Sequence, residues 1–245
     1  MKKLLLALFM IVPFFVSACS CDKFDIKTYE TAVGNYTRST GFKYKLRVTV
    51  KPEGASEYKR EESINSYILT PDGSVEDYAS ELKKFKIPVD KNGVEGNPSL
   101  TSTIYRYYVG ATGKIYTKIK EGSSAPVTSS VVKRYEEEHS GTTDKNNLKN
   151  LVPIFATSEM DEFHILKLSG SKGYSIATFD AAVPAHIECT EDLTTYTVIM
   201  NKSFQFSSIA FSVVNGTTIT EYEYTFYDYN SDVVIDFPTD LVSYN

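Results

Sequence analysis

The residues suited to acid–base, nucleophilic or metal chemistry lie scattered along this 245-residue chain. The three histidines are far apart, and no two of them have the spacing of metal ligands: His139, His164 and His186. Serine followed three positions later by lysine recurs, but the two motifs that accompany this pair in penicillin-binding enzymes are absent. Gly110-Ala-Thr-Gly113-Lys114 lacks the spacing of a phosphate-binding loop. We therefore expect a non-catalytic protein with no catalytic residue, no metal and no cofactor.

Two groups of charged residues suit ligands of other kinds. Carboxylates near the end of the chain would suit calcium, but the calcium-loop spacing is absent and a solvated strand face is favoured: Glu221, Glu223, Asp228, Asp232 and Asp236. Basic residues that alternate with apolar ones would suit anionic lipid headgroups. The wet side of an antiparallel sheet is again the favoured interpretation for them: Lys43, Lys45, Arg47 and Lys51.

Cys19 is the residue for which the neighbouring sequence indicates a specific modification. Two lysines precede an apolar run from Leu4 to Val16, interrupted only by Pro13, which is too short to span a bilayer. Small residues follow, as in a secretory signal. Val16-Ser17-Ala18-Cys19 also resembles the lipobox of bacterial lipoproteins, in which the cysteine is acylated and becomes the first residue. An ordinary signal peptide is the alternative interpretation.

The lipobox resemblance predicts how the chain is organised and where it resides. We expect a lipoprotein signal peptide over residues 1–18, a lipidated tether over 19–27 and a single domain over 28–245. The protein would be exported and anchored in the cell membrane by its N-terminal lipid, facing the extracytoplasmic side. Acylation of Cys19 leaves Cys21 and Cys189, and export permits either a disulfide between them or two free thiols.

Charge and composition limit both the kind of partner and the fold class that the chain can have. Removal of the signal takes away two lysines, so the formal net charge moves from −5 to −7. An acidic chain of this kind argues against a nucleic-acid partner. The mature chain is rich in tyrosine and phenylalanine and has no tryptophan, and such a composition favours strands.

Hydrophobic periodicity predicts the elements. Ile26, Tyr29, Val33 and Tyr36 have helical spacing, which predicts a helix that ends near Gly41. Strict alternation from Phe42 to Lys51 predicts an antiparallel strand with one covered face. Further strands are expected over residues 58–70, 103–109, 114–120, 127–137, 162–169, 174–179, 194–201, 204–214, 217–229 and 233–237. Residues 75–85, for which a strand is the second choice, and residues 148–155 have helical spacing. Taken together, these elements predict one mainly β domain of the α+β class, with roughly ten antiparallel strands and two or three helices.

This order of elements resembles the LolA/LppX-like superfamily of bacterial envelope lipoproteins and lipoprotein carriers. The likeness lies in the N-terminal helix before Phe42–Lys51, the tyrosine-rich hairpin Thr103–Lys120, the expected helix near Leu148–Phe155 and the terminal YEYTFYDYNSDVVIDFP. It implies an incomplete, half-barrel antiparallel sheet that curls around helices and encloses an apolar cavity for a lipid or acyl chain. The chain departs from the soluble carriers in having its own lipobox and lacking their Arg- and Trp-bearing strands.

Three hypotheses for function follow. In the first, a half-barrel cavity binds a lipid or acyl chain, with one wall formed by Phe42, Tyr44, Leu46, Val48, Tyr222, Tyr224 and Phe226. A filled core explains the same residues. In the second, such a filled core supports a surface that binds another envelope protein through tyrosines, which suit interfaces: Tyr105, Tyr107, Tyr108 and Tyr116. An enzyme is the third and least favoured class.

Overall fold

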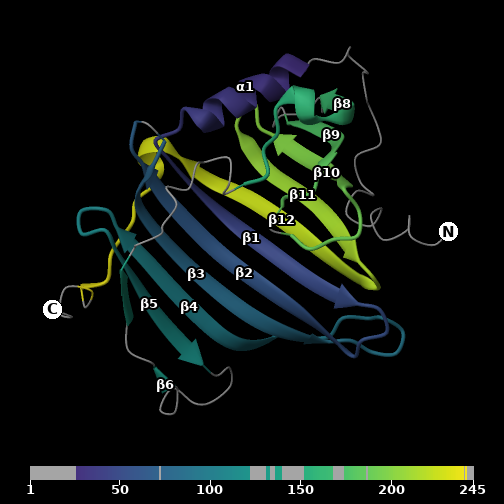
Figure 1. Ribbon diagram of the computed structural model, residues 1–245, viewed down its shortest axis with the longest axis horizontal. Coiled ribbons are helices and arrows are strands. Elements are labelled where there is room, and N and C mark those ends of the chain that lie inside the picture. The colour runs from purple at the N-terminus through teal and green to yellow at the C-terminus, as the bar shows by residue number, and fades with distance from the viewer. Residues whose placement is uncertain are drawn as a thin grey trace.

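In the computed structural model the chain forms one curved antiparallel sheet (Figure 1). The structure describes residues 26–71, 73–121, 131–132, 136–139, 152–167, 174–185, 187–239 and 241. The expected signal peptide and most of the tether, including Cys19 and Cys21, lie outside these residues. So do His186 and most of the strand expected over residues 127–137.

The first half of the sheet is a meander of long strands. Its strands are β1 (Gly41–Pro52), β2 (Glu57–Leu69), β3 (Val75–Pro88), β4 (Ser99–Val109) and β5 (Lys114–Glu121). Two short strands, β6 (Val131–Val132) and β7 (Glu136–His139), pair with β5. Gly54 has a φ of +68° in the turn between β1 and β2, a conformation that glycine adopts without strain.

The second half is also a meander, and it returns to the first strand. It contains β8 (Asp161–Lys167), β9 (Ser175–Ala182), β10 (Leu193–Met200), β11 (Phe206–Asn215) and β12 (Thr218–Tyr229). The predicted Asn215-Gly216 turn joins β11 to β12, with a φ of +60° at Gly216. β12 then pairs with β1, so the order across the sheet is β6-β5-β4-β3-β2-β1-β12-β11-β10-β9-β8. Because β8 and β6 do not pair in the described part of the chain, the sheet is open there.

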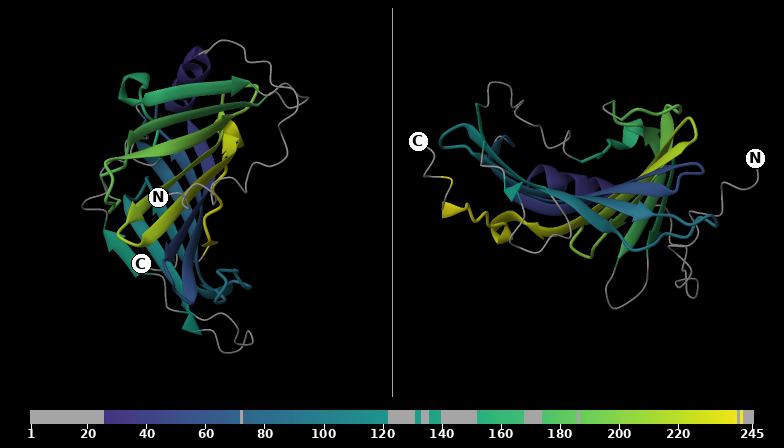
Figure 2. Two further views of the ribbon diagram at one scale, coloured as in Figure 1. Left: turned by 90° about the vertical axis from the view of Figure 1, so that its right-hand side faces the viewer. Right: turned by 90° about the horizontal axis from the view of Figure 1, so that it is seen from below.

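Helix α1 (Ile26–Thr37) lies on the concave side of the sheet (Figure 2). Its buried residues Tyr29, Ala32 and Tyr36 follow helical spacing, as predicted. The ring of Tyr29 lies 5.8 Å from that of Phe163 on β8 and 5.6 Å from that of Phe179 on β9. The helix therefore covers the β8–β12 half, while β2 to β5 have no helix above them in the described structure.

The predicted helix over residues 75–85 is wrong, because this segment is strand β3, the second choice. β3 pairs with β2 from Val75 to Pro88 on one side and with β4 from Asp77 to Lys86 on the other. Its apolar residues divide between the two faces of the sheet, with Leu82 on the concave face and Phe85 on the convex one. Pairing with two neighbouring strands outweighs a helical spacing that arose by coincidence.

The helix predicted over residues 148–155 is also wrong where the structure describes it. Val152 to Ala156 contains no helix, and the N–H of Ile154 donates to the carbonyl of Val152 at 2.9 Å. Only a short 3₁₀ turn, η3 (Thr157–Glu159), follows. Pro153 has no N–H for a helical hydrogen bond. Val152 is instead fully buried in the core, and the ring of Phe155 lies 4.8 Å from that of Tyr196. Since α1 is the one α-helix among the described residues, the two or three expected helices are too many.

The short closing strand predicted over Val233–Phe237 does not form. β12 already pairs with β1 and β11, so neither of its edges is free. After the 3₁₀ turn η4 (Asn230–Asp232), this segment instead lies against the convex face, where the ring of Phe237 is 6.2 Å from that of Tyr107.

Candidate ligand-binding face

The seven residues predicted to form a wall lie together on the concave face of β1 and β12. Antiparallel register places Tyr44 opposite Phe226, Leu46 opposite Tyr224 and Val48 opposite Tyr222, and Phe42 lies next along the same face of β1. Side chains of directly opposite residues share a face of a sheet. Two strands separated by more than 160 positions in the chain thus form one continuous apolar surface. Its use as a ligand-binding wall stays a prediction.

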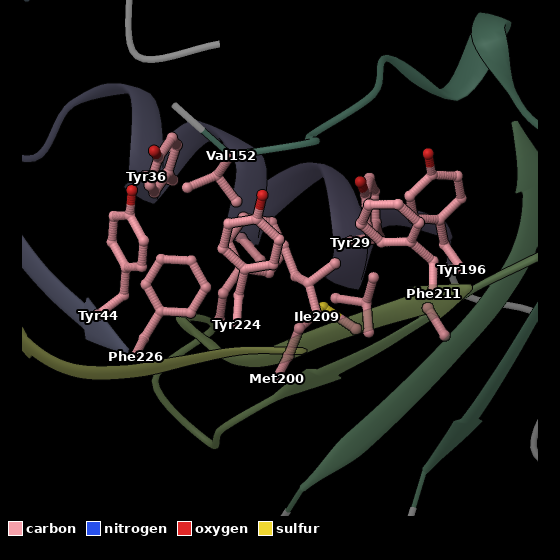
Figure 3. Packing of buried hydrophobic residues seen from close by; sticks show 14 of the residues in the cluster. Tyr29, Tyr36, Tyr44, Val152, Tyr196, Met200, Ile209, Phe211, Tyr224 and Phe226 are labelled. Atoms are coloured by element: carbon pink, nitrogen blue, oxygen red, sulfur yellow. The ribbon is translucent and has the colours of Figure 1, made fainter. Parts of the chain in front are cut away.

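One end of this wall is packed core. Phe42, Tyr44, Tyr224 and Phe226 each keep at most 7% of their surface exposed. In Figure 3, Tyr44, Tyr224 and Phe226 rise from the sheet toward Tyr36 of α1 and toward Val152. The ring of Tyr36 lies 5.1 Å from that of Phe42 and 6.2 Å from that of Phe226. At this end the filled-core alternative therefore describes the structure.

The other end of the wall opens onto a hollow. Leu46, Val48 and Tyr222 are only partly buried. Next to them on the concave face lies a hollow of about 340 Å³, formed by residues of β2, β3 and β4: Glu61, Ser63, Asn65, Tyr78, Ser80, Leu82, Lys84, Ile104 and Arg106. Register links the two regions, because Leu46 pairs with Ser63 and Val48 with Glu61. Sequence reasoning missed these lining residues. If residues 78–84 are interpreted as a strand, the alternation of its even-numbered residues identifies the lining residues that come from β3.

A row of three tyrosines in ring contact connects the packed end to the hollow. The ring of Tyr67 on β2 lies 6.1 Å from that of Tyr44 and 4.8 Å from that of Tyr78 on β3. The hydroxyl of Tyr67 interacts with both of these phenols, and Tyr78 also interacts with Ser80. Burial raises the pKa of Tyr44, Tyr67 and Tyr78, so all three are neutral hydrogen-bonding groups at neutral pH.

The convex face carries a ladder of ion pairs. Glu62 on β2 accepts from Lys45 at 2.6 Å and from Arg47 at 3.1 Å. Arg47 also reaches Glu223 on β12 at 3.0 Å, and Lys51 reaches Glu221 at 2.9 Å. Basic residues of β1 and Glu221 and Glu223 of β12 therefore compensate one another on a solvated face, as the favoured interpretation predicts for them. For Asp232 and Asp236 the predicted strand face is wrong, because Asp232 lies in the turn η4 and Asp236 follows it outside any strand. In the described residues, no group of three or more His, Cys, Asp or Glu is placed to hold a metal ion.

Cys189 is a free thiol in this structure, and its Sγ donates to the backbone oxygen of Glu191 at 3.0 Å. Cys21 lies outside the described residues, so the disulfide between the two stays a prediction. Within the described part of the chain, no helix is both long and apolar enough to cross a bilayer.

No protein-family model and no curated protein matches this chain. Among solved structures, lipoprotein LppX of Mycobacterium tuberculosis is similar, with 9% identity and a TM-score of 0.39 over 86% of this chain and 97% of LppX. A β-barrel-like protein of a domain family of unknown function, from Brucella abortus, has 9% identity and a TM-score of 0.31 over 78% and 99% of the two chains. A LolA-superfamily protein of Nitrosomonas europaea has 8% identity and a TM-score of 0.22 over 88% and 95%. LppX and a LolA-superfamily protein are thus among the structures that this chain resembles, as predicted. These similarities concern the arrangement of the chain and not what it binds.

Proposed function

We propose that the chain is an exported, lipid-anchored envelope protein that binds a hydrophobic ligand, a lipid or an acyl chain, on its concave face without catalysing a reaction. The observation that carries the proposal is the apolar wall of β1 and β12, which is packed at one end and continues at the other into the unfilled hollow. The hollow falls at the lower end of the range of ligand sites, roughly 300–1,000 Å³. That size suits one chain of a lipid rather than a large cargo.

Apolar residues flank the opening, while six of the nine residues that line the hollow are polar or charged: Glu61, Ser63, Asn65, Ser80, Lys84 and Arg106. Leu46, Val48 and Tyr222 come from the wall, and Leu82 and Ile104 come from the floor of the hollow. All five are only partly buried, so a ligand there would remove apolar surface from water at about 25 cal/mol per Å².

Filling the hollow tests this proposal. The chain contains no tryptophan, so Leu82→Trp places a single indole in the hollow and Ile64→Trp places one on the exposed convex face of β2. We expect Leu82→Trp to lower the affinity for a fluorescent fatty-acid methyl ester by at least about tenfold, or about 1.4 kcal/mol. Ile64→Trp should bind the ester as the wild type does. Equal binding by both variants and the wild type would refute a ligand site in this hollow.

A second candidate function is binding to another envelope protein through the convex face. The four tyrosines predicted to form this surface are divided by the structure, since Tyr108 pairs with Tyr78 on the concave face and Tyr116 is buried. Tyr105 and Tyr107 do face outward, around a second hollow of about 210 Å³. Ile64 and Val234 nearby are 39% and 70% exposed. A photo-crosslinking residue at Val234 should capture an envelope protein in intact cells if this function holds. One at Glu53, in the exposed turn after β1, is the matched control.

A further inference from the structure

One guanidinium in the hollow has no ion-pair partner in the described part of the chain. Lys84 and Glu61 neutralise each other at 2.8 Å, whereas no carboxylate pairs with Arg106 on β4. The three charged side chains that line the hollow therefore leave one net positive charge. The convex face differs, because Arg47 there contacts two carboxylates.

A buried hydroxyl without a partner lies next to this cation. Thr117 on β5 is directly opposite Arg106, so both side chains are on the concave face. Thr117 is only 6% exposed, and its Oγ1 is the one buried side-chain polar atom in the described residues that makes no hydrogen bond. Ser80, which is 8% exposed, is opposite Arg106 on the other side, in β3. An unpaired buried hydroxyl is destabilising, and such atoms are rare in folded proteins.

We propose that Arg106, Thr117 and Ser80 bind the anionic headgroup of an amphiphile, a carboxylate or a phosphate, whose chain lies along the apolar wall. This inference rests on the proposed function and specifies its ligand class. Arginine binds both kinds of oxyanion through two parallel N–H bonds, and the hydroxyl of Thr117 adds a donor beside it. The hydroxyl of Ser80, which also interacts with Tyr78, lies on the other side of Arg106. A bound oxyanion gives Thr117 the acceptor that it lacks.

The spacing of the strands fits a ligand of this shape. β4 and β1 are separated by β3 and β2, which is roughly 14 Å at about 4.8 Å between neighbouring strands. A headgroup on Arg106 therefore directs the chain across Leu82 and toward Leu46 and Val48. On this path Leu82 and the β1 end are apolar. The polar groups are those at the Arg106 end, together with Ser63 and the Glu61–Lys84 ion pair of the strands in between.

Binding of the purified full chain to a fluorescent long-chain fatty acid and to its methyl ester tests the inference. The wild type should bind the acid at least about tenfold more tightly than the ester, a difference of about 1.4 kcal/mol. Arg106→Gln should remove this preference by lowering the affinity for the acid to about that for the ester. Arg106→Lys keeps the charge but not the paired N–H donors, so it should retain part of the preference. Arg47→Gln, on the convex face, is the matched control and should behave as the wild type.

Thr117→Val separates ligand binding from a structural role. The variant removes the unpaired hydroxyl, so its midpoint of thermal unfolding should be unchanged or higher while its affinity for the acid falls about threefold. Lower stability together with unchanged acid affinity would overturn the role of Thr117.

The remaining outcomes distinguish this inference from the function on which it rests. If neither acid nor ester binds, the proposed hydrophobic site itself is wrong. If both bind equally to the wild type, the hydrophobic site holds and the headgroup assignment is overturned. If acetate or inorganic phosphate displaces the acid at concentrations near that of the acid itself, the hollow is a site for small free anions, which also overturns the assignment.

Discussion

Phe226 and Tyr222 lie four positions apart on the same face of β12, yet the structure gives them different roles. Phe226 is 7% exposed, and its ring lies between 5.8 and 6.2 Å from the rings of four residues: Tyr36, Tyr44, Phe206 and Tyr229. Tyr222 is partly exposed and stacks on one ring, that of Phe211, at 4.7 Å. Truncation of Phe226 removes packed core, whereas truncation of Tyr222 removes part of the open end of the wall.

The expected losses of folding stability follow from this difference in packing. A buried Phe→Ala change costs about 3–5 kcal/mol, so Phe226→Ala should lower the free energy of unfolding by about 4 kcal/mol. Tyr222→Ala should lower it by about 1–2 kcal/mol, since less of the ring leaves a packed environment. Urea unfolding followed by circular dichroism measures both losses. With a slope of about 2–3 kcal/mol per M, the midpoint should fall by about 1.5 M for Phe226→Ala and by under about 1 M for Tyr222→Ala.

Binding should show the opposite order. Tyr222→Ala should weaken binding of the fatty-acid ester about fivefold, while folded Phe226→Ala protein should bind it as the wild type does. Equal losses of stability in the two variants, or a loss below about 1 kcal/mol for Phe226→Ala, would refute the division of the wall into a packed end and an open end.

Three further outcomes are expected. Partial burial opposes ionisation of Glu62, but its hydrogen bonds and ion pairs with Lys45 and Arg47 outweigh burial and hold its pKa below the usual value. Glu62→Gln should therefore lower the free energy of unfolding by up to about 1 kcal/mol at neutral pH. The urea midpoints of the variant and the wild type should converge as the pH falls through that lowered pKa, and a difference that does not depend on pH would contradict this. Burial raises the pKa of Tyr44 and Tyr224, whereas unfolded tyrosines ionise near pH 10. These tyrosines should therefore leave the free energy of unfolding unchanged from neutral pH to about pH 10 and then lower it by about 1.4 kcal/mol per pH unit each; a flat profile above pH 10 in the same urea series would refute this. Cys19→Ala should release the protein from the membrane fraction or leave it unprocessed, since stable anchoring requires the acyl chains, and mature Cys19→Ala protein that stays in the membrane would argue against lipidation.

The sequence predicts the strands with clear alternation, because alternation encodes which face is buried. Phe42–Lys51 and the Asn215-Gly216 hairpin were predicted within one or two residues of β1 and of the β11–β12 turn. The pairing of β1 with β12 brings together the seven wall residues, and the predicted list contained both strands because both alternate. For residues 75–85 the sequence favours a helix first and a strand second, because a helical spacing competes with the alternation, and only pairing with β2 and β4 decides between them.

The hollow could not be predicted in the same way. Arg106 and Ser80, which line the hollow, and Thr117, which lies opposite Arg106, come from three different strands, and only the sheet register makes them neighbours. Nor does the sequence show that α1 stops short of β2 to β5, which leaves that part of the concave face unfilled. Tyrosine content likewise suggested one outward surface, whereas the pleat divides Tyr107 and Tyr108 between the two faces.

Native mass spectrometry of the protein purified from a bacterial host tests the central claim most directly. The account predicts a co-purifying mass of lipid size that is lost on organic extraction and is reduced in Leu82→Trp. A bare protein mass for the wild type, after gentle extraction that keeps other lipid complexes intact, would contradict a hydrophobic ligand on the concave face.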